Sequence, residues 1–158
     1  MTETMVVGVD GTADSLAALT SAAELADESG ASLVVLHVRH GSGIAAGSLE
    51  AGAEAVMSAA LDQAEKTSRE QASEVLSGRT VRWRFDVAFG DPATELIAAA
   101  RDHHASTIVV GGRSHGVIGG LVIGSVAQKL VRHSPVSVLV VRGGHPYSLQ
   151  AASSLSSS

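Results

Sequence analysis

The chain has 158 residues, which is enough for one domain with its own hydrophobic core. It contains no cysteine, which excludes disulfides, zinc-thiolate sites and thiol catalysis, and its formal net charge of -5 argues against general binding to nucleic acid or anionic membranes. The N-terminus lacks a basic region followed by an apolar run, and no segment is apolar for long enough to span a bilayer, so we expect a cytoplasmic protein.

Five short apolar segments, each bounded by turn residues, predict β-strands. Three of them are dense in Val, Leu and Ile without alternation, which is typical of strands covered on both faces. The segment from Val81 to Val87 alternates apolar and polar residues, so we expect it at a sheet edge, with Trp83, Phe85 and Phe89 packed beneath a helix. In chain order the segments are Met5–Asp10, Ser32–Arg39, Thr80–Phe89, Ser106–Gly111 and Val136–Arg142.

Helical patterns separate these strands. The first helix opens after Thr12 as N-cap and stops at Gly30, whereas Asp91 and Pro92 supply the N-cap and the first position of the third helix. We expect the last helix to begin near Gly124 and to end before Ser134-Pro135. The first three helices are predicted over Ala13–Ser29, Glu50–Leu76 and Ala93–His103.

Strands that alternate with helices predict an α/β fold: a single doubly wound, five-stranded parallel sheet with helices on both faces. An edge position for the third strand gives the strand order 3-2-1-4-5, with the topological switch point between the first and fourth strands. We expect the domain to span residues 1–142 and the polar tail, residues 143–158, to be disordered. Ligands of such sheets bind at the carboxyl ends of the strands, beside the switch point.

The glycine-rich segment that follows the fourth strand, residues 111–125, predicts an anion site. Gly124 and Ser125 lie where the last helix begins, so unpaired amides and the positive end of the helix dipole favour a phosphate there. Arg113 and His115 offer further donors, whereas Lys129 and Arg132 are predicted to lie too far along the helix.

These residues resemble those of the universal stress protein family. Members that bind ATP have a glycine, two residues, a second glycine, nine residues, and then Gly followed by Ser or Thr; here the pattern starts at Gly111 and ends at Gly124-Ser125, with Ser114 in the second glycine position. The resemblance covers roughly residues 4 to 142. It also includes Val6–Gly11, Leu36-His37-Val38, Gly90-Asp91-Pro92 and Ser134-Pro135.

The resemblance implies a stress-response protein that binds ATP or AMP, with or without Mg²⁺, and acts as a sensor or regulatory module. It places Asp10 near the ribose or adenine, and the Val38 backbone at the adenine edge. The implied nucleotide-binding residues are Val9, Asp10, Val38, Gly111, Arg113, Ser114, Gly124, Ser125 and Val126. The strongly apolar last strand, Val136–Val141, is an exposed edge that predicts a homodimer, an arrangement common in that family.

Two alternatives remain open. A dimeric interaction protein of the same fold, with no bound nucleotide, is consistent with the Cβ that Ser114 places where backbone would approach a phosphate. A slow ATPase is the other, because residues 119–125 have the glycine spacing of a P-loop but Ser125 replaces its lysine. Asp10 also has an alternative role as a cap of the first helix.

We assign no catalytic residue and no metal ligand. Gly112–Gly116 fits the nucleophile elbow of serine hydrolases, but no acidic residue follows Asp102 to complete the required order of triad residues. His103 and His104 are adjacent on a helix and point about 100° apart, which disfavours a shared metal ion. Binding without fast hydrolysis is therefore the function that the sequence favours.

Overall fold

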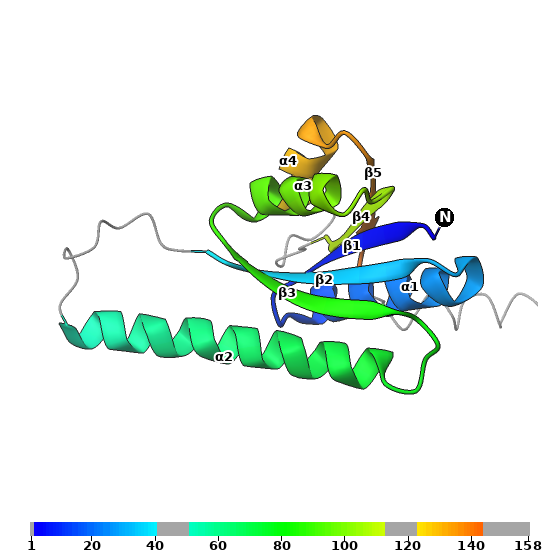
Figure 1. The fold of residues 1–158 in the computed structure, drawn as a ribbon. Helices are drawn as coiled ribbons and strands as arrows, with labels where there is room; N and C mark the ends of the chain where they lie inside the picture. Colours follow the sequence, from blue (N-terminus) through cyan, green and yellow to red (C-terminus); the bar gives the residue numbers. More distant parts are fainter. Residues whose placement is uncertain (1, 41–50, 113–122, 144–158) are drawn as a thin grey trace, which may run out of the picture.

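The computed structural model describes residues 2–40, 51–112 and 123–143. It contains a five-stranded parallel sheet in the order β3-β2-β1-β4-β5, with helices on both faces, which confirms the predicted fold class (Figure 1). Among the described residues, no helix combines the length and apolar character needed to cross a membrane. The elements are β1 (Thr4–Val9), α1 (Ala13–Ser29), β2 (Ser32–Arg39), α2 (Ala51–Leu76), β3 (Trp83–Phe89), α3 (Pro92–Asp102), β4 (Thr107–Gly111), α4 (Ser125–His133) and β5 (Ser137–Val141).

The helix boundaries follow from local capping. The Thr12 side chain accepts a hydrogen bond from the Ser15 amide at 3.3 Å, and Gly30, with a φ of 76°, ends α1 by donating to the Ala26 carbonyl at 2.9 Å. Asp91 accepts from the Thr94 amide at 3.1 Å and caps α3. Thr12, Gly30 and Asp91 thus have the capping positions that the sequence predicted, and each satisfies a helix-end group that would otherwise be unpaired.

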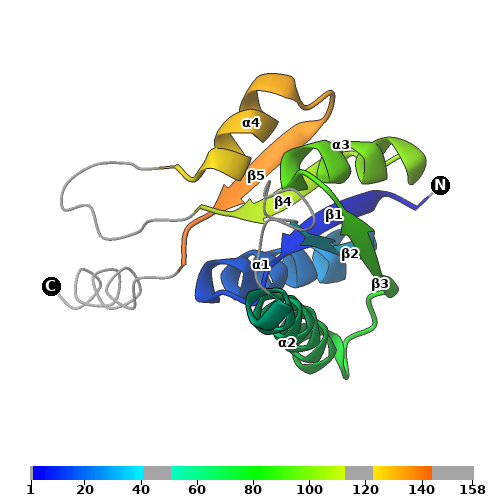
Figure 2. The same cartoon turned by 90° about the vertical axis from the view of Figure 1, so that its left-hand side faces the viewer.

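Two apolar clusters cover the two faces of the sheet. Figure 2 shows α1 and α2 on one face of the sheet and α3 and α4 on the other. Alternate residues of each strand point to opposite faces, so Val7 packs toward α1 and α2 whereas Val6 packs toward α3 and α4. Both side chains are fully buried. Each fully buried Val or Leu side chain contributes roughly 1.5–3 kcal/mol, so the central strands stabilise the fold strongly.

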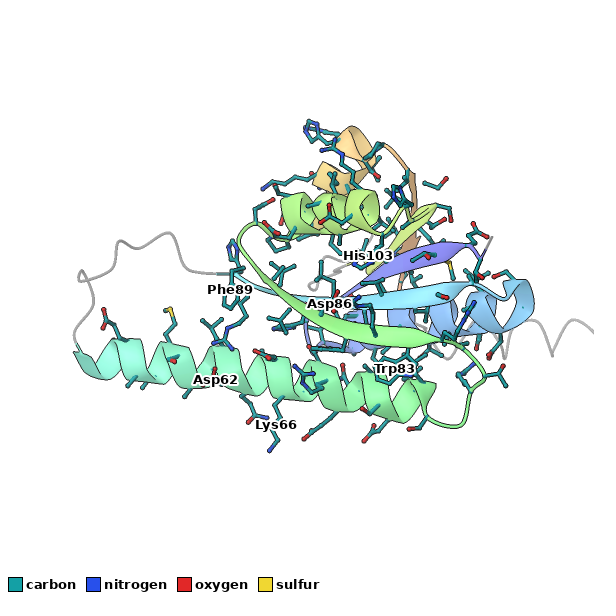
Figure 3. All side chains as sticks on the ribbon, viewed as in Figure 1. Asp62, Lys66, Trp83, Asp86, Phe89 and His103 are labelled. Carbon is teal, nitrogen blue, oxygen red and sulfur yellow. The ribbon has the colours of Figure 1, made fainter. Side chains whose placement is uncertain are left out.

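The third strand lies at an edge, as its alternating sequence predicted. It begins at Trp83, three residues later than expected, where Trp83 comes opposite Leu33 of β2. Trp83 and Phe85 pack against the cluster on the α1 and α2 side. The prediction that Phe89 packs beneath a helix is wrong: Phe89 is 73% exposed at the end of the strand (Figure 3).

A buried histidine joins three elements near the carboxyl end of the sheet. His37 of β2 is only 3% exposed, and its Nδ1 lies 3.0 Å from the Val9 carbonyl and 3.0 Å from the Ser68 hydroxyl of α2. The carbonyl can only accept, so Nδ1 carries a hydrogen and donates it to Val9. Burial lowers the pKa of His37 below its ordinary value of 6.5, against the opposing effect of the Val9 hydrogen bond.

This lowered pKa makes the stability of the fold depend on pH. Below the ordinary value of 6.5, the unfolded chain binds a proton at His37 that the folded chain resists. We therefore expect the free energy of unfolding in urea to be level between about pH 7 and 8 and to fall as the pH decreases through about 6.5. His37→Gln should flatten the slope between about pH 6.5 and 5.5, and an unchanged slope in that variant would contradict this role.

Candidate functional site

A cavity of about 410 Å³ opens at the carboxyl ends of β1, β2 and β4, beside the switch point between β1 and β4. The chain leaves β1 toward α1 on one face, whereas α3 and α4 cover the other face, so the two connections diverge and leave a crevice. Its apolar part is formed by Leu36, Val38, Leu96 and Val110. The cavity combines this apolar surface with polar groups on its rim, as ligand sites do.

The start of α4 forms one wall of the cavity. Gly124 is the N-cap, and it lines the cavity together with Ser125, Val126 and Ala127. Glycine has no side chain with which to cap the helix, and the first amides of a helix have no partner within it. This wall can therefore bind an anion, with the helix dipole favouring negative charge.

Asp10 is held on the opposite wall by the turn that leads into α1. Its Oδ1 accepts hydrogen bonds from the Thr12 amide at 3.0 Å and from the Thr12 hydroxyl at 2.5 Å. Its own amide donates to the Ser15 hydroxyl oxygen at 3.2 Å. Thr12, not Asp10, is the N-cap of α1, so the carboxylate of Asp10 braces the turn and lines the cavity.

Lys129 lies in the cavity wall, and the prediction that it is too far along α4 is wrong. It follows Ser125 by four residues, and residues at this spacing share one face of a helix. Its Nζ donates to Oδ1 of Asp91 at 3.0 Å. The hydrogen bond from Lys129, with those from Thr94, lowers the pKa of Asp91 from 3.8 to about 2, so this carboxylate is ionised at neutral pH.

The charges around the cavity are mixed. The carboxylates of Asp10, Asp14 and Asp91 line it, together with the ammonium of Lys129. His40 also lines it and is exposed, with Nδ1 at 3.3 Å from the Gly90 carbonyl. In the described ranges, no group of three or more His, Cys, Asp or Glu side chains is arranged to hold a metal ion.

Most of the residues predicted to bind a nucleotide come together in this cavity. Two of them, Arg113 and Ser114, lie outside the described residues. The predicted residues that line the cavity are Val9, Asp10, Val38, Gly111, Gly124, Ser125 and Val126. Sequence reasoning missed several polar neighbours, namely Thr12, Asp14, Ser15, Asp91 and Lys129, although the cap pattern and the four-residue spacing from Ser125 could have indicated Asp91 and Lys129.

Gly111 is required by packing, whatever the cavity binds. A Cβ at this position would lie 2.7 Å from the backbone C and O of Asp14, so the end of β4 and the start of α1 touch through backbone. Atoms of a backbone cannot move aside as the end of a flexible side chain can. The first glycine of the pattern therefore fixes how closely the end of β4 approaches the start of α1.

We expect Gly111→Ala to destabilise the protein by about 1–3 kcal/mol, because α1 and β4 must separate to admit the methyl group. Urea unfolding measures this change. Gly52→Ala is the matched control: nothing lies within 4 Å of that Cβ, and alanine in an exposed helix should stabilise by roughly 0.5–1 kcal/mol. Equal effects of the two substitutions would show that the close contact at Gly111 has no energetic weight.

The architecture and the cavity define an α/β protein with a ligand site at the switch point of a parallel sheet. The model of the universal stress protein family matches residues 1–142, and the chain belongs to that family. It is 32% identical over 145 residues to the universal stress protein YxiE of Bacillus subtilis (strain 168), covering 87% of this chain and 97% of YxiE.

Solved structures agree with this assignment. The universal stress protein UspA from Lactobacillus plantarum superposes with a TM-score of 0.72 at 23% identity, over 89% of this chain and 97% of UspA, and it supports the fold alone. A universal stress protein crystallised in complex with cAMP superposes with a TM-score of 0.65 at 25% identity, over 90% of this chain and 98% of that protein. The predicted family and fold are thus confirmed.

Proposed function

We propose that this universal stress protein binds an adenine nucleotide, ATP or AMP, in the cavity at the carboxyl end of its sheet, and that it acts as a sensor or regulatory module. The observation that carries the proposal is the meeting, in one cavity, of the uncapped start of α4 with the Asp10 turn and the exit of β2. Phosphate, ribose and base each have a suitable neighbour in that arrangement.

The polar groups suggest how the nucleotide is oriented. Ser125 and Val126 at the start of α4 suit the phosphates, since their amides and the helix dipole favour an anion. The Asp10 carboxylate suits a ribose hydroxyl or the adenine, both of which can donate hydrogen bonds. Val38, the residue before the end of β2, lies beside the apolar part of the cavity, where its backbone can meet the edge of the base.

The charges that line the cavity affect how many phosphates it can bind and whether Mg²⁺ assists the binding. Three carboxylates and one lysine line the described wall, so each added phosphate meets repulsion that Lys129 offsets in part. Mg²⁺ bound to the phosphates would lower this repulsion, and it needs only one or two protein carboxylates because it keeps several waters. A comparison of ATP and AMP binding with and without Mg²⁺ measures this effect.

The family comparison supports the same class of ligand. The solved relative in complex with cAMP carries an adenine nucleotide and covers 90% of this chain. An adenine ring with ribose and phosphate is common to cAMP, AMP and ATP. We therefore take the purine nucleoside monophosphate unit as the shared recognition element.

A charge at the first position of α4 tests the phosphate position. We expect Ser125→Asp to weaken ATP binding by about tenfold or more, because it places a carboxylate where the phosphates bind. The helix itself tolerates the change, since an acidic residue suits its first turn. Val131→Glu is the matched control: it adds the same charge at a 63% exposed position further along α4, outside the cavity wall, and should leave the affinity within about twofold. Calorimetry measures both affinities, and equal losses would argue against the phosphate position.

The alternative of an empty pocket is tested on the unmodified protein. Nucleotide released by heating freshly purified protein, identified by chromatography, supports binding, whereas no released nucleotide and no calorimetric signal with ATP, ADP or AMP would favour the interaction protein. Phosphate release with magnesium and ATP tests the slow ATPase, and we assign no residue to that reaction.

We also propose a homodimer through the last strand, Val136–Val141. β5 is the edge strand beside β4, and the Val141 carbonyl accepts from the Gly112 amide, so Val138 and Val140 direct their backbone groups away from β4. Antiparallel pairing with a second copy would satisfy these groups. The support is the apolar character of this edge strand.

Light scattering after gel filtration should give twice the chain mass of 16.0 kDa. Val140→Pro removes an N–H that faces outward while leaving the bonds to β4, so it should shift the protein toward monomer. The unmodified protein measured as a monomer at all concentrations would rule out the dimer.

A further inference from the structure

The outer edge of β3 offers unpaired backbone groups. In the described part of the chain, β3 pairs with β2 on one side and has no strand on the other. The Arg82 carbonyl accepts from Leu33 of β2, and the Gly90 amide donates to Arg39 of β2. Parallel strands alternate the direction of their backbone groups, so Phe85 and Val87 present their N–H and C=O groups away from the sheet.

These groups lie in a groove of about 390 Å³ that runs along the strand edge. One wall comes from α3, where Ala98 and Ala99 leave room for an incoming side chain, and Arg69 of α2 contributes to the other wall. The guanidinium of Arg69 lies over the Phe85 ring, 4.4 Å from its centroid. Figure 3 shows Asp86 and His103 at this edge, between β3 and α3.

The α3 wall of the groove carries excess negative charge. Asp86 is balanced by Arg84 at 2.9 Å, and His103 lies 3.6 Å from its other oxygen. Glu95 and Asp102 also line the groove, and within the described ranges neither carboxylate has a hydrogen bond or ion pair. The opposite side combines the apolar surface of Phe85 and Val87 with the guanidinium of Arg69, whose charge is paired with Glu65 at 3.3 Å.

We propose that the outer edge of β3 binds an extended segment of a partner protein as a sixth strand of the sheet. Main-chain hydrogen bonds to Phe85 and Val87 would supply affinity, and alternate side chains would supply specificity. The segment carries Lys or Arg on the side that faces Glu95 and Asp102, and apolar residues on the side that faces Phe85. This site is independent of the proposed nucleotide, and it lies at the opposite edge of the sheet from β5.

Charge favours such a segment over a second copy of this chain. Edge-to-edge pairing of two β3 strands by a twofold axis would bring two copies of Glu95 and of Asp102 to one groove. Like charges in that position repel, and the one basic residue of β3, Arg84, is already paired with Asp86. A basic extended segment instead neutralises the free carboxylates.

The test uses a short fluorescein-labelled peptide of alternating lysine and valine, with the same peptide carrying glutamate in place of lysine as its control. We expect saturable anisotropy with the lysine peptide and none with the glutamate peptide. Glu95→Gln with Asp102→Asn should weaken binding about fivefold at low salt. The matched control, Glu24→Gln with Glu28→Gln on exposed positions of α1, removes the same charge elsewhere and should have little effect.

Backbone pairing is tested separately from charge. N-methylation of the peptide either at its valines or at its lysines blocks one side of its backbone, so one of these two peptides should lose binding and the other should retain it. Slowed amide exchange at Phe85 and Val87 should accompany binding. Equal binding of both methylated peptides, equal effects of the two double variants, no saturable binding, or binding of the glutamate peptide would each overturn the proposal.

Discussion

The central strand β1 is buried by helices on both of its faces, and the positions of the other elements follow from this burial. Met5, Val7 and Val9 pack toward α1 and α2, whereas Val6 packs toward α3 and α4, and none of these side chains is more than 5% exposed. A strand with this composition is stable only between two layers. Its neighbours β2 and β4 extend the sheet to either side, and the crevice between their connections forms beside its carboxyl end.

The same constraint explains why the site is assembled from distant parts of the chain. Asp10 leaves the central strand, Lys129 comes from the last helix, and Asp91 joins the edge strand to α3. Lys129 belongs to α4, whereas Asp10 and Asp91 lie in short turns and are held there by hydrogen bonds from Thr12 and Thr94. Preorganised polar groups of this kind lose little entropy when a ligand binds.

The layers of this fold are predictable from sequence because each strand carries its own pattern. The apolar run of β2 and the alternation near Val87 place one strand inside the sheet and the other at its edge, and Gly30 marks a helix end. Local signals cannot predict pairings between distant residues. The bond from Lys129 of α4 to Asp91, the N-cap of α3, joins residues 38 positions apart, and the exposure of Phe89 depends on where its covering layer ends.

The candidate site likewise contains residues that local sequence patterns indicate and residues whose roles depend on distant contacts. Gly124 and Ser125 can be read from the sequence because a helix start has a local pattern, and Asp10 follows a strand directly. Gly111 is different: its role depends on the backbone of Asp14, which only the folded chain brings within contact. His37 reaches Ser68 of α2 across 31 residues, and no local pattern in the sequence indicates that pair.

The length of α2 has a consequence for local unfolding. Its 26 residues span about 39 Å, well beyond the strands that it covers (Figure 1). Ser68 and Ala72 are fully buried, whereas Val56, near the start, is 71% exposed. The helix therefore has an anchored half and an overhanging half, and the first turns can fray without disturbing the cooperative unit to which the sheet belongs. A protease that needs an unwound backbone would cut this half first while the core remains intact.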